Sequence, residues 1–476
     1  MPGFRSESDL LGEEQIPEIA YYGIFTKRAQ DNFNISGQRI HPLFIKYLAL
    51  VKKAAAEANQ KLGYLDLKLA SAITHAADEV IEGKLEENFD LDIFQAGAGT
   101  PWNMNMNEVL ANRANEILGE PRGTYFPVHP NDHVNMMQSS NDVIPNTIRL
   151  SAIKLLKKLF NSLESLEEAL TAKAMKFIND NKSGRTHLRD AVPIKMGQEL
   201  GAYSNAVKKL RIQLERASSN LQQISLGGTA IGTGINTDPN YSKTIVNNLR
   251  ELTGFNLIPA DDFIEKTQFM SDFKILMDHL SGLAVVLLKI CNDLILLSSG
   301  PLTGINEIHL PTVEPGSSIM PGKINPSILE SVNMVCFQVL GNRATIEQAC
   351  IAGSLELNVY TPVIAYNLFN SIIWLSNAVD NLRQRCIEGL MINLEQTEKY
   401  FRNSNAIATL LSPILGYTTA SKLALEAVNS RRPIMDLAIE KGLLTTEEAN
   451  LVSMNSTEPN MKLIREIIEK RKSELT

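Results

Sequence analysis

The most regular pattern in the chain is a stripe of leucines that recurs every three or four residues. Between residues 146 and 183 there is no Gly or Pro, and five leucines follow steps of 3, 4, 3 and 4: Leu156, Leu159, Leu163, Leu166 and Leu170. This spacing places the five side chains on one face of a helix. The pattern therefore predicts one long helix over this stretch, with a leucine seam that packs against a neighbouring helix.

Four further tracts extend the helical pattern. Residues 202–226 carry a second apolar stripe without Gly or Pro, and the other tracts span residues 263–299, 327–350 and 362–388. These last three tracts are apolar around much of the helix circumference, which indicates burial on all sides. Because a bundle of five helices leaves each helix an outer face, the sequence predicts a homo-oligomer with a helical core. The alternative is that the terminal segments of the same chain cover these faces.

Composition places the chain among ordinary globular proteins. Its length of 476 residues favours about three domains, and 44% hydrophobic with 21% charged residues exclude a disordered chain. A net charge of −7 gives no overall attraction for nucleic acid or anionic membranes, so we expect neither as a partner. The four cysteines are widely spaced, and we interpret them as free buried thiols in a reducing compartment.

The sequence shows no targeting or membrane-spanning segment. The N-terminal stretch MPGFRSESDLLGEEQ lacks an apolar run behind a basic start. The longest apolar run, residues 283–297, is interrupted by Lys289, Asn292 and Asp293 and is shorter than the roughly 20 residues that a spanning helix needs. We interpret this run as a buried core helix and expect a cytoplasmic protein.

The loop GSSIMPGKINP, residues 316–326, is the most unusual stretch of the sequence. Gly316 and Gly322 permit close approach of a ligand, and the two prolines stiffen the rest of the loop. Lys323 supplies a positive charge and Asn325 a hydrogen-bond donor, a pair that suits a carboxylate. The alternative is a surface turn that contains one lysine.

Three other turn-rich spans, GAGT, QSSND and GRTHLRD, carry hydroxyl, amide and imidazole side chains. Their candidate residues are Thr100; Ser139, Ser140 and Asn141; and Thr186 and His187. QSSND precedes the first long helix, where unpaired backbone N–H groups favour an anion, and simple helix capping is the alternative. A lone histidine is often structural. Together with one lysine, these groups suit a small dianionic acid better than a polymer.

Several other chemistries have no motif in the chain. There is no GxSxG nucleophile elbow, no HExxH and no cluster of Asp and His. A Walker-type loop is also missing, as is GxGxxG between a strand and a helix. We therefore expect an enzyme without metal or cofactor.

In their order and spacing, GSSIMPGKINP, QSSND, GRTHLRD and GGTAIGTGIN resemble the aspartase/fumarase superfamily. The similarity extends from AYYGIFTKRAQDNF to GLLTTEEAN, nearly the whole chain. The stretches YYGIFTKRA, LKICNDLILLSSGP, VNMVCFQVLGN and LELNVYTPVIAYN are more similar to aspartate ammonia-lyases than to class II fumarases. The resemblance implies a mainly α, three-domain fold, with an N-terminal domain (1–141), a central helical bundle (142–395) that forms a tetrameric core, and a small C-terminal domain (396–476).

The resemblance also implies a role for each candidate residue. Ser317 matches the catalytic base, and Lys323 and Asn325 match the binders of the substrate α-carboxylate. The remaining matches are Thr100, Ser139, Ser140 and Asn141 around the other carboxylate and the leaving group, Thr186 and the catalytic His187, and Glu330 as the acid near that histidine. Each active site of the homotetramer would combine loops from three subunits, and no cofactor takes part.

The implied reaction is elimination of ammonia from L-aspartate to give fumarate through an aci-carboxylate carbanion. A class II fumarate hydratase is the alternative enzyme, because fumarases carry Ser140 and the run HPND, residues 129–132, looks like their second carboxylate site. A third alternative is a catalytically silent oligomeric scaffold. Four residues depart from the family pattern: Pro101, Asn146, Arg189 and Leu302, the last of which stands where an arginine is usual.

Overall fold

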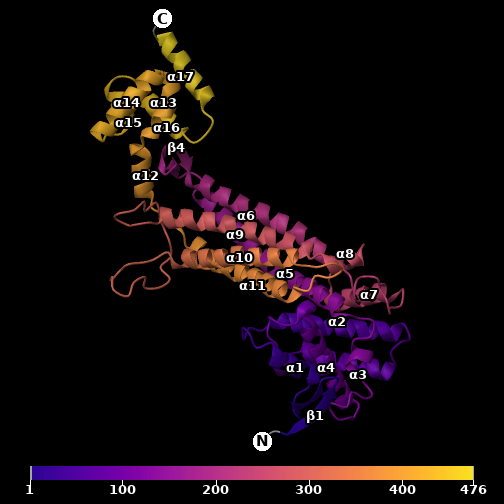
Figure 1. Cartoon of the computed structure of the whole chain (residues 1–476). Coiled ribbons are helices and arrows are strands. Elements are labelled where there is room, and N and C mark those ends of the chain that lie inside the picture. Colours follow the sequence, from indigo (N-terminus) through magenta and orange to yellow (C-terminus); the bar gives the residue numbers. More distant parts are fainter. Residues whose placement is uncertain (1–2, 475–476) are drawn as a thin grey trace. The chain divides into compact units, whose positions relative to one another are not determined.

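The computed structural model describes residues 3–474 and is mainly helical (Figure 1). Its five long helices are α5 (Ser140–Lys176), α6 (Met196–Ser218), α9 (Ser271–Leu297), α10 (Ser327–Ile351) and α11 (Thr361–Leu382). They occupy the five tracts in which the apolar pattern predicts helices. All five leucines of the stripe in α5 are buried, which confirms the predicted seam.

The ends of the first two helices differ from the prediction. α5 ends at Lys176 and α6 at Ser218, short of the predicted residues 183 and 226. The segment Asn179, Asp180 and Asn181 has low helix propensity, and a strand begins within it. A stretch without Gly or Pro permits a helix but does not require one.

The chain divides into two compact units, and each of the five long helices has residues in both. Unit 1 comprises the described residues up to 161 together with 210–285 and 335–377. Unit 2 comprises 162–209, 286–334 and the described residues from 378 onward. The three-domain division implied by the resemblance stays a prediction.

Unit 1 combines an N-terminal hairpin with several shorter helices. Its other elements are β1 (Phe4–Asp9), β2 (Gly12–Pro17), α1 (Ile24–Asn32), α2 (Pro42–Lys61), α3 (Leu67–Ile81), η1 (Glu86–Asn88), η2 (Gly97–Gly99), α4 (Thr100–Ile117), η3 (Pro130–Val134), η4 (Ser219–Gln222), β5 (Gln223–Ile224), α7 (Tyr241–Thr253), β6 (Ile258–Pro259) and α8 (Phe263–Gln268). β1 pairs antiparallel with β2, and β5 pairs parallel with β6. α2 packs on α3, and both bury small side chains such as Ala55 and Ala76, which allows close approach of the two helices.

A buried carboxylate fixes α1 against α4. Glu108 of α4 accepts hydrogen bonds from the backbone N–H groups of Gly23, Phe25 and Thr26, at 2.9, 2.9 and 3.1 Å. These N–H groups lie at the start of α1, where a helix leaves its donors unpaired. The Glu108 carboxylate, from the middle of α4, therefore accepts the hydrogen bonds of the otherwise unpaired N–H groups at the start of α1.

Unit 2 contains a hairpin, a two-residue sheet and a C-terminal group of helices. Its other elements are β3 (Asn181–Thr186), β4 (Arg189–Lys195), β7 (Ile308–His309), η5 (Arg383–Ile387), β8 (Met391–Ile392), α12 (Leu394–Asn403), η6 (Asn405–Ile407), α13 (Ala408–Leu415), α14 (Tyr417–Ser430), α15 (Ile434–Glu440), α16 (Thr446–Met454) and α17 (Met461–Glu474). β3 pairs with β4 and β7 with β8, both antiparallel. Figure 1 shows α13 to α16 gathered together, and they share an apolar cluster that includes Leu411, Leu423 and Leu437.

Among the described residues, α9 is the one helix whose length and composition would allow it to cross a membrane. Its charged side chains, however, pair with neighbouring helices. Asp272 accepts from Arg149 of α5 at 2.7 Å, and Asp278 accepts from Arg343 of α10 at 2.9 Å. Arg149 is almost fully buried. These contacts fit the interpretation of α9 as a core helix.

Large apolar side chains of α9 and α10 remain exposed in the single chain. Val285, Met334 and Phe337 are 53%, 63% and 60% exposed. The sequence offers two coverings for such positions, other copies of the chain or its own terminal segments, and the choice between them stays a prediction. A second copy of the chain is the covering that the sequence predicts.

The cysteines agree with the prediction of free thiols. None of the four forms a disulfide, three are buried, and Cys350 is partly buried. Burial raises the pKa of Cys336 and of Cys386 to about 12. Such thiols stay protonated and unreactive at neutral pH.

Candidate active site

Thr100 is the first residue of α4 and lies at the end of a sharp backbone turn. Ala98 and Gly99 both have positive φ, 59° and 68°. A Cβ on Gly99 would lie 3.0 Å from Ile144, so the turn depends on glycine both for space and for conformation. Pro101 falls in the first turn of α4, where a missing N–H costs nothing. This departure from the family pattern is therefore compatible with the helix that presents Thr100.

Ser139, Ser140 and Asn141 lie at the start of α5, as expected. The Ser139 N–H donates to Asp142 at 2.9 Å, and the Ser139 hydroxyl accepts from the Asn141 N–H at 3.2 Å. The Asn141 side-chain amide donates to the carbonyl of Ala230 at 2.7 Å, which holds the loop LGGTAIGTGIN against the helix start. The start of α5 is thus capped by Ser139 and also holds three of the candidate binding residues. Ser139 and Asn141 are half-buried, and Ser140 is buried.

Two ionisable groups that the sequence analysis did not single out are buried beside these serines. Asp142 accepts hydrogen bonds from the backbone N–H groups of Gly227 and Thr229, at 3.1 and 3.0 Å. Burial raises the pKa of Asp142 to about 6 and lowers the pKa of Lys52 to about 7. The Lys52 ammonium donates to side-chain oxygens of Asn135 and Gln138.

Asn103 was also missed, although it shares a helix face with Thr100. Its side-chain amide donates to Ser140 Oγ at 3.2 Å and to Asn135 Oδ1 at 3.1 Å. A signal was present in the stretch NMNMNEVLANRAN, which places asparagines, poor helix formers, inside a helix. The five asparagines of this stretch, Asn103, Asn105, Asn107, Asn112 and Asn115, are all buried.

Thr186 and His187 lie at the tip of the hairpin β3–β4. His187 and Leu188 are the two central residues of the turn, with φ of 55° and 58°, the pattern of a type I′ turn. Such angles are unfavourable for side chains other than Gly, Asn or Asp, and strain of this kind gathers at functional sites. Thr186 and His187 are exposed.

A buried ion cluster anchors this hairpin. Arg185 donates to both oxygens of Glu307, at 2.9 and 3.0 Å, and Lys182 lies 3.1 Å from the same carboxylate. The Glu307 side chain is fully buried. Because Glu307 directly precedes β7 and the loop towards Ser317, the cluster ties the hairpin to the base of that loop.

The loop GSSIMPGKINP closes on itself through its own backbone. The Gly316 N–H donates to the Lys323 carbonyl at 2.9 Å, and the Asn325 amide donates to the Gly316 carbonyl. A Cβ on Gly316 would lie 2.5 Å from the backbone nitrogen of Asn325, so a side chain does not fit there. Asn325 thus shapes the loop in this structure, in addition to its expected role in binding.

Ser317 is placed where its oxygen receives backbone donors. The N–H groups of Ile319 and Met320 donate to Ser317 Oγ, at 3.3 and 2.9 Å. Hydrogen bonds of this kind stabilise an oxyanion more than a neutral hydroxyl. The two backbone donors would therefore favour the deprotonated form of the Ser317 hydroxyl.

Lys323 lies on the exposed side of the same loop. A cavity of about 530 Å³ adjoins it and is lined also by Asn325 and Arg385. Arg385 is a second cation that no sequence motif indicated. Leu302, where the family usually has arginine, is 95% exposed.

The candidate residues are divided between the two units. Unit 1 holds Thr100 and the QSSND residues, and unit 2 holds Thr186, His187, Ser317, Lys323, Asn325 and Glu330. Within the described chain, no hydrogen bond joins His187 to Glu330, and Glu330 is exposed on the first turn of α10. The pairing of this acid with the histidine stays a prediction.

Other departures noted in the sequence have local explanations. Asn146 is buried, donates to the Asp142 carbonyl and to Ser225 Oγ, and accepts from the Ser225 N–H. In the run HPND, His129 Nδ1 accepts from the N–H groups of Asn131 and Asp132. His129 therefore caps the short helix η3. Arg189 is exposed at the start of β4.

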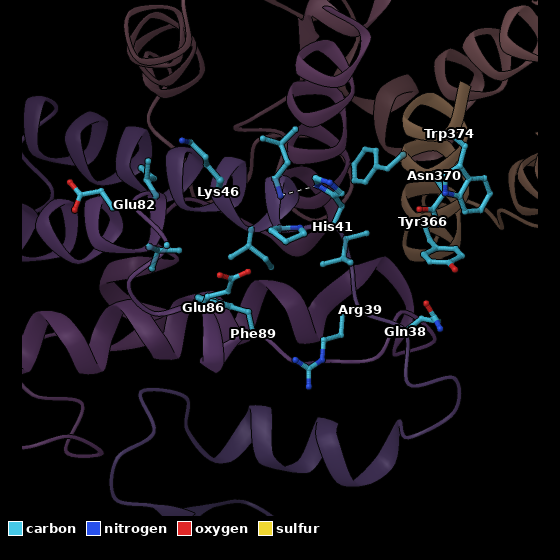
Figure 2. Close-up of a pocket in the computed structure, with 18 residues that line it drawn as sticks. Gln38, Arg39, His41, Lys46, Glu82, Glu86, Phe89, Tyr366, Asn370 and Trp374 are labelled. Atoms are coloured by element: carbon cyan, nitrogen blue, oxygen red, sulfur yellow. Dashed lines mark hydrogen bonds between the residues drawn. The ribbon is translucent and has the colours of Figure 1, made fainter. Parts of the chain in front are cut away.

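A further cleft, of about 760 Å³, lies in unit 1 between the start of α2, the end of α3 and α11 (Figure 2). Charged side chains of both signs line it, among them Arg39, Lys46 and Glu82, together with Trp374. None of the candidate residues from the sequence lies there. Among residues 3–474, no three His, Cys, Asp or Glu side chains gather in a group suited to a metal ion.

Comparison with known proteins identifies the family. A family model described as Lyase matches residues 12–341, and one described as Fumarase C C-terminus matches residues 407–453. The chain is 46% identical to the aspartate ammonia-lyase of Helicobacter pylori, covering 93% of this chain and 95% of that protein. It is 43% identical to that of Bacillus subtilis, with 94% of each covered, and 44% identical to that of Escherichia coli, with 93% and 94% covered.

Solved structures agree with this assignment. A fumarate lyase:delta crystallin of Brucella melitensis bound to cobalt superposes with a TM-score of 0.93 at 43% identity, covering 96% of this chain and 100% of that one. A class II fumarase of Schistosoma mansoni superposes with a TM-score of 0.91 at 36% identity, covering 95% and 98%. Family models, full-length relatives and superposed structures thus coincide with the resemblance seen in the loops, and the chain belongs to the aspartase/fumarase superfamily of lyases.

Proposed function

We propose that this protein is an aspartate ammonia-lyase, which catalyses the reversible elimination of ammonia from L-aspartate to give fumarate. The observation that carries the proposal is similarity, over more than nine-tenths of the chain, to proteins that are aspartate ammonia-lyases. The class II fumarase superposes at lower identity, 36% against the 43% or more of these relatives. The expected site residues are all present in the loops described above.

Proton removal is assigned to Ser317. The hydroxyl releases its own proton to water before the substrate binds, and the resulting oxyanion then takes a proton from the β-carbon of L-aspartate. Each unit by which the pKa of the hydroxyl is lowered requires about 1.4 kcal/mol of preferential stabilisation of the oxyanion. The N–H groups of Ile319 and Met320 supply part of it, and the charge of Lys323 supplies more.

The electron pair left on carbon moves into the β-carboxylate and gives an aci-carboxylate with two negative oxygens. Hydrogen-bond donors aimed at this charge lower the barrier, each by about 3 to 4 kcal/mol by analogy with oxyanion holes. We assign this task to Thr100, Ser139 and Ser140, with Asn141 beside them. Collapse of the intermediate breaks the bond from the α-carbon to nitrogen, forms the double bond of fumarate and releases ammonia.

Lys323 and Asn325 are assigned to the α-carboxylate, and Thr186 and His187 complete the pocket near the leaving group. Holding both carboxylates fixes the substrate with its β-hydrogen towards Ser317. We assign His187, with Glu330 as its acid, to exchange a proton with the departing amine. A small dicarboxylate is therefore the expected substrate.

We further propose a homotetramer whose active sites combine loops of three subunits. The exposed apolar side chains of Val285, Met334 and Phe337 on the long helices α9 and α10 support this assembly. The separation of the candidate residues into two groups supports shared sites, since two groups from different subunits would complete one another. A cytoplasmic location stays a prediction of the sequence.

The test is to supply fumarate with and without ammonium and to identify the product. We expect L-aspartate in the presence of ammonium and no product in its absence. Formation of L-malate without ammonium, together with no turnover of L-aspartate, would establish a fumarate hydratase instead, which Ser140 and the HPND run favour. Absence of either reaction would support the silent scaffold.

A further inference from the structure

A lysine without an acidic partner in contact lies beneath the serines of the candidate site. The Lys52 side chain, on α2, is fully buried. Its ammonium donates to Asn135 Oδ1 at 3.0 Å and to Gln138 Oε1 at 2.9 Å. The Gln138 amide nitrogen in turn donates to the carbonyls of Val134 and Met136. Burying a lysine is costly, so a role beyond packing is expected for it.

The ammonium determines which way the neighbouring amides face. In its ammonium form lysine only donates hydrogen bonds, so the Asn135 atom that faces Lys52 is its oxygen. Asn103 contacts this same oxygen at 3.1 Å and must do so with its NH₂ group. The NH₂ group also lies 3.2 Å from Ser140 Oγ. The Lys52 ammonium thus fixes which end of the Asn135 amide and of the Asn103 amide faces its neighbour. The orientation of such amides is otherwise ambiguous.

This polarity decides what the Ser140 hydroxyl is able to do. Because its oxygen accepts from Asn103, the hydroxyl proton is directed away from Asn103. If the Asn103 amide were flipped, its oxygen would face Ser140 and the Ser140 hydroxyl would donate its hydrogen bond to that oxygen. The buried oxygen of Asn103 has no hydrogen-bond partner, which is the cost of holding the amide in this one orientation.

We propose that Lys52, Asn135 and Asn103 form a positioning relay that keeps the Ser140 hydroxyl as a hydrogen-bond donor towards the substrate carboxylate. The proposal rests on the proposed function for the role of Ser140. It assigns the three residues no contact with substrate: Asn103 acts through Ser140, and Lys52 acts through Asn135 and Asn103.

The test is a double-mutant cycle between Asn103→Asp and Ser140→Ala, measured as kcat/KM. An aspartate at 103 only accepts, so the Ser140 hydroxyl would donate to it and be lost to the substrate. Each single variant is expected to lose on the order of 100-fold in kcat/KM, as for removal of one oxyanion donor. The double variant is expected to be no worse than the worse single variant, within about 2-fold.

Asn107→Asp is the matched control. Asn107 is a buried asparagine of the same helix whose amide contacts Met104 and not Ser140. Its loss in kcat/KM, whatever its size, should multiply with that of Ser140→Ala. If the losses of Asn103→Asp and Ser140→Ala multiply in the same way, the network only supports the fold and the proposal is overturned. A Ser140→Ala variant with unchanged kcat/KM would overturn it as well.

Lys52→Met provides a second cycle should Asn103→Asp fail to fold. It is expected to lower kcat/KM in the wild-type background and to have no further effect on kcat/KM in the Ser140→Ala background. Lys53→Met is its control, because Lys53 is the neighbouring lysine and its ammonium pairs with an acid, Asp78, at 2.6 Å.

Failure of the proposed function would be visible separately, in the activity of the wild-type protein. The cycle is then measured with L-malate if that is the substrate, or as the Kd of succinate if neither substrate is converted.

Discussion

At the scale of single residues, the loop GSSIMPGKINP holds both the proposed base, Ser317, and a proposed carboxylate binder, Lys323, so single variants test the two roles separately. Ser317→Ala is expected to lose nearly all turnover yet still bind a dicarboxylate inhibitor such as succinate, because the carboxylate binders remain. Lys323→Ala should instead weaken inhibitor binding strongly, since a charge partner inside a closed site is worth more than a surface ion pair. The measurement is the ratio of the loss in kcat to the loss in inhibitor affinity for each variant. Equal losses of affinity in both variants would contradict the assignment, and substantial activity in Ser317→Ala would move the base to His187.

Single residues also mark where sequence reasoning stops. The motifs predicted Ser139 and Ser140 at the start of a helix and Ser317 in a loop, and the structure has them there, because Gly, Pro and Ser mark turns and helix starts in recognisable ways. Asn103 and Lys52 lie inside helices, where an asparagine or lysine carries no motif. Their contacts to the loop at Ser140 come from packing between α2, α4 and the start of α5, which spacing along the chain does not reveal.

At the scale of elements, the C-terminal helices offer a pH test. Glu448 at the start of α16 accepts from Arg471 of α17 through both oxygens, which lowers the pKa of Glu448 from 4.5 to about 2. Because the folded pKa is the lower one, the stabilisation is present above about pH 4.5 and is lost as the pH falls towards 2. At neutral pH, Glu448→Gln should reduce the free energy of unfolding by about 2 to 3 kcal/mol.

Thermal or urea unfolding of the Glu448→Gln variant and the wild-type protein between pH 7 and the acid limit of folding checks this prediction. The difference in unfolding free energy between the two proteins should shrink as the pH falls below about 4.5. Glu440→Gln is the control, because Glu440 pairs with Arg432 at the surface. A constant difference at all pH values would mean that Glu448 acts through packing and not through its charge.

Helices were predictable from the sequence where apolar periodicity alone determines them. The long helices follow from apolar periodicity, which burial of the leucine stripe then enforces. The hairpin β3–β4 was not foreseen, because its turn holds His187 and Leu188 where a hairpin ordinarily shows Asn or Gly. The anchoring of this hairpin by Glu307, more than one hundred residues further along, is a tertiary constraint that no local pattern records.

At the scale of the whole molecule, the exposed apolar positions make assembly testable. Phe337→Asp is expected to dissociate the proposed tetramer and abolish activity, because the phenylalanine is 60% exposed on α10, close to the exposed Met334. Sedimentation velocity measures the assembly, and circular dichroism shows whether the subunit keeps its helices. Leu425→Asp is the control, since Leu425 is 64% exposed on the C-terminal α14. An active monomer would refute the shared active site.

The division of the candidate residues between two units has a consequence for mixtures of inactive proteins. A Ser140→Ala tetramer has intact Ser317 loops, and a Ser317→Ala tetramer has intact Ser140 loops. If the two are unfolded together and refolded as hybrids, some sites will draw the intact version of each loop from a different subunit. With random assortment this applies to about a quarter of the sites. Two preparations that are each nearly dead should therefore recover about a quarter of the wild-type activity on mixing.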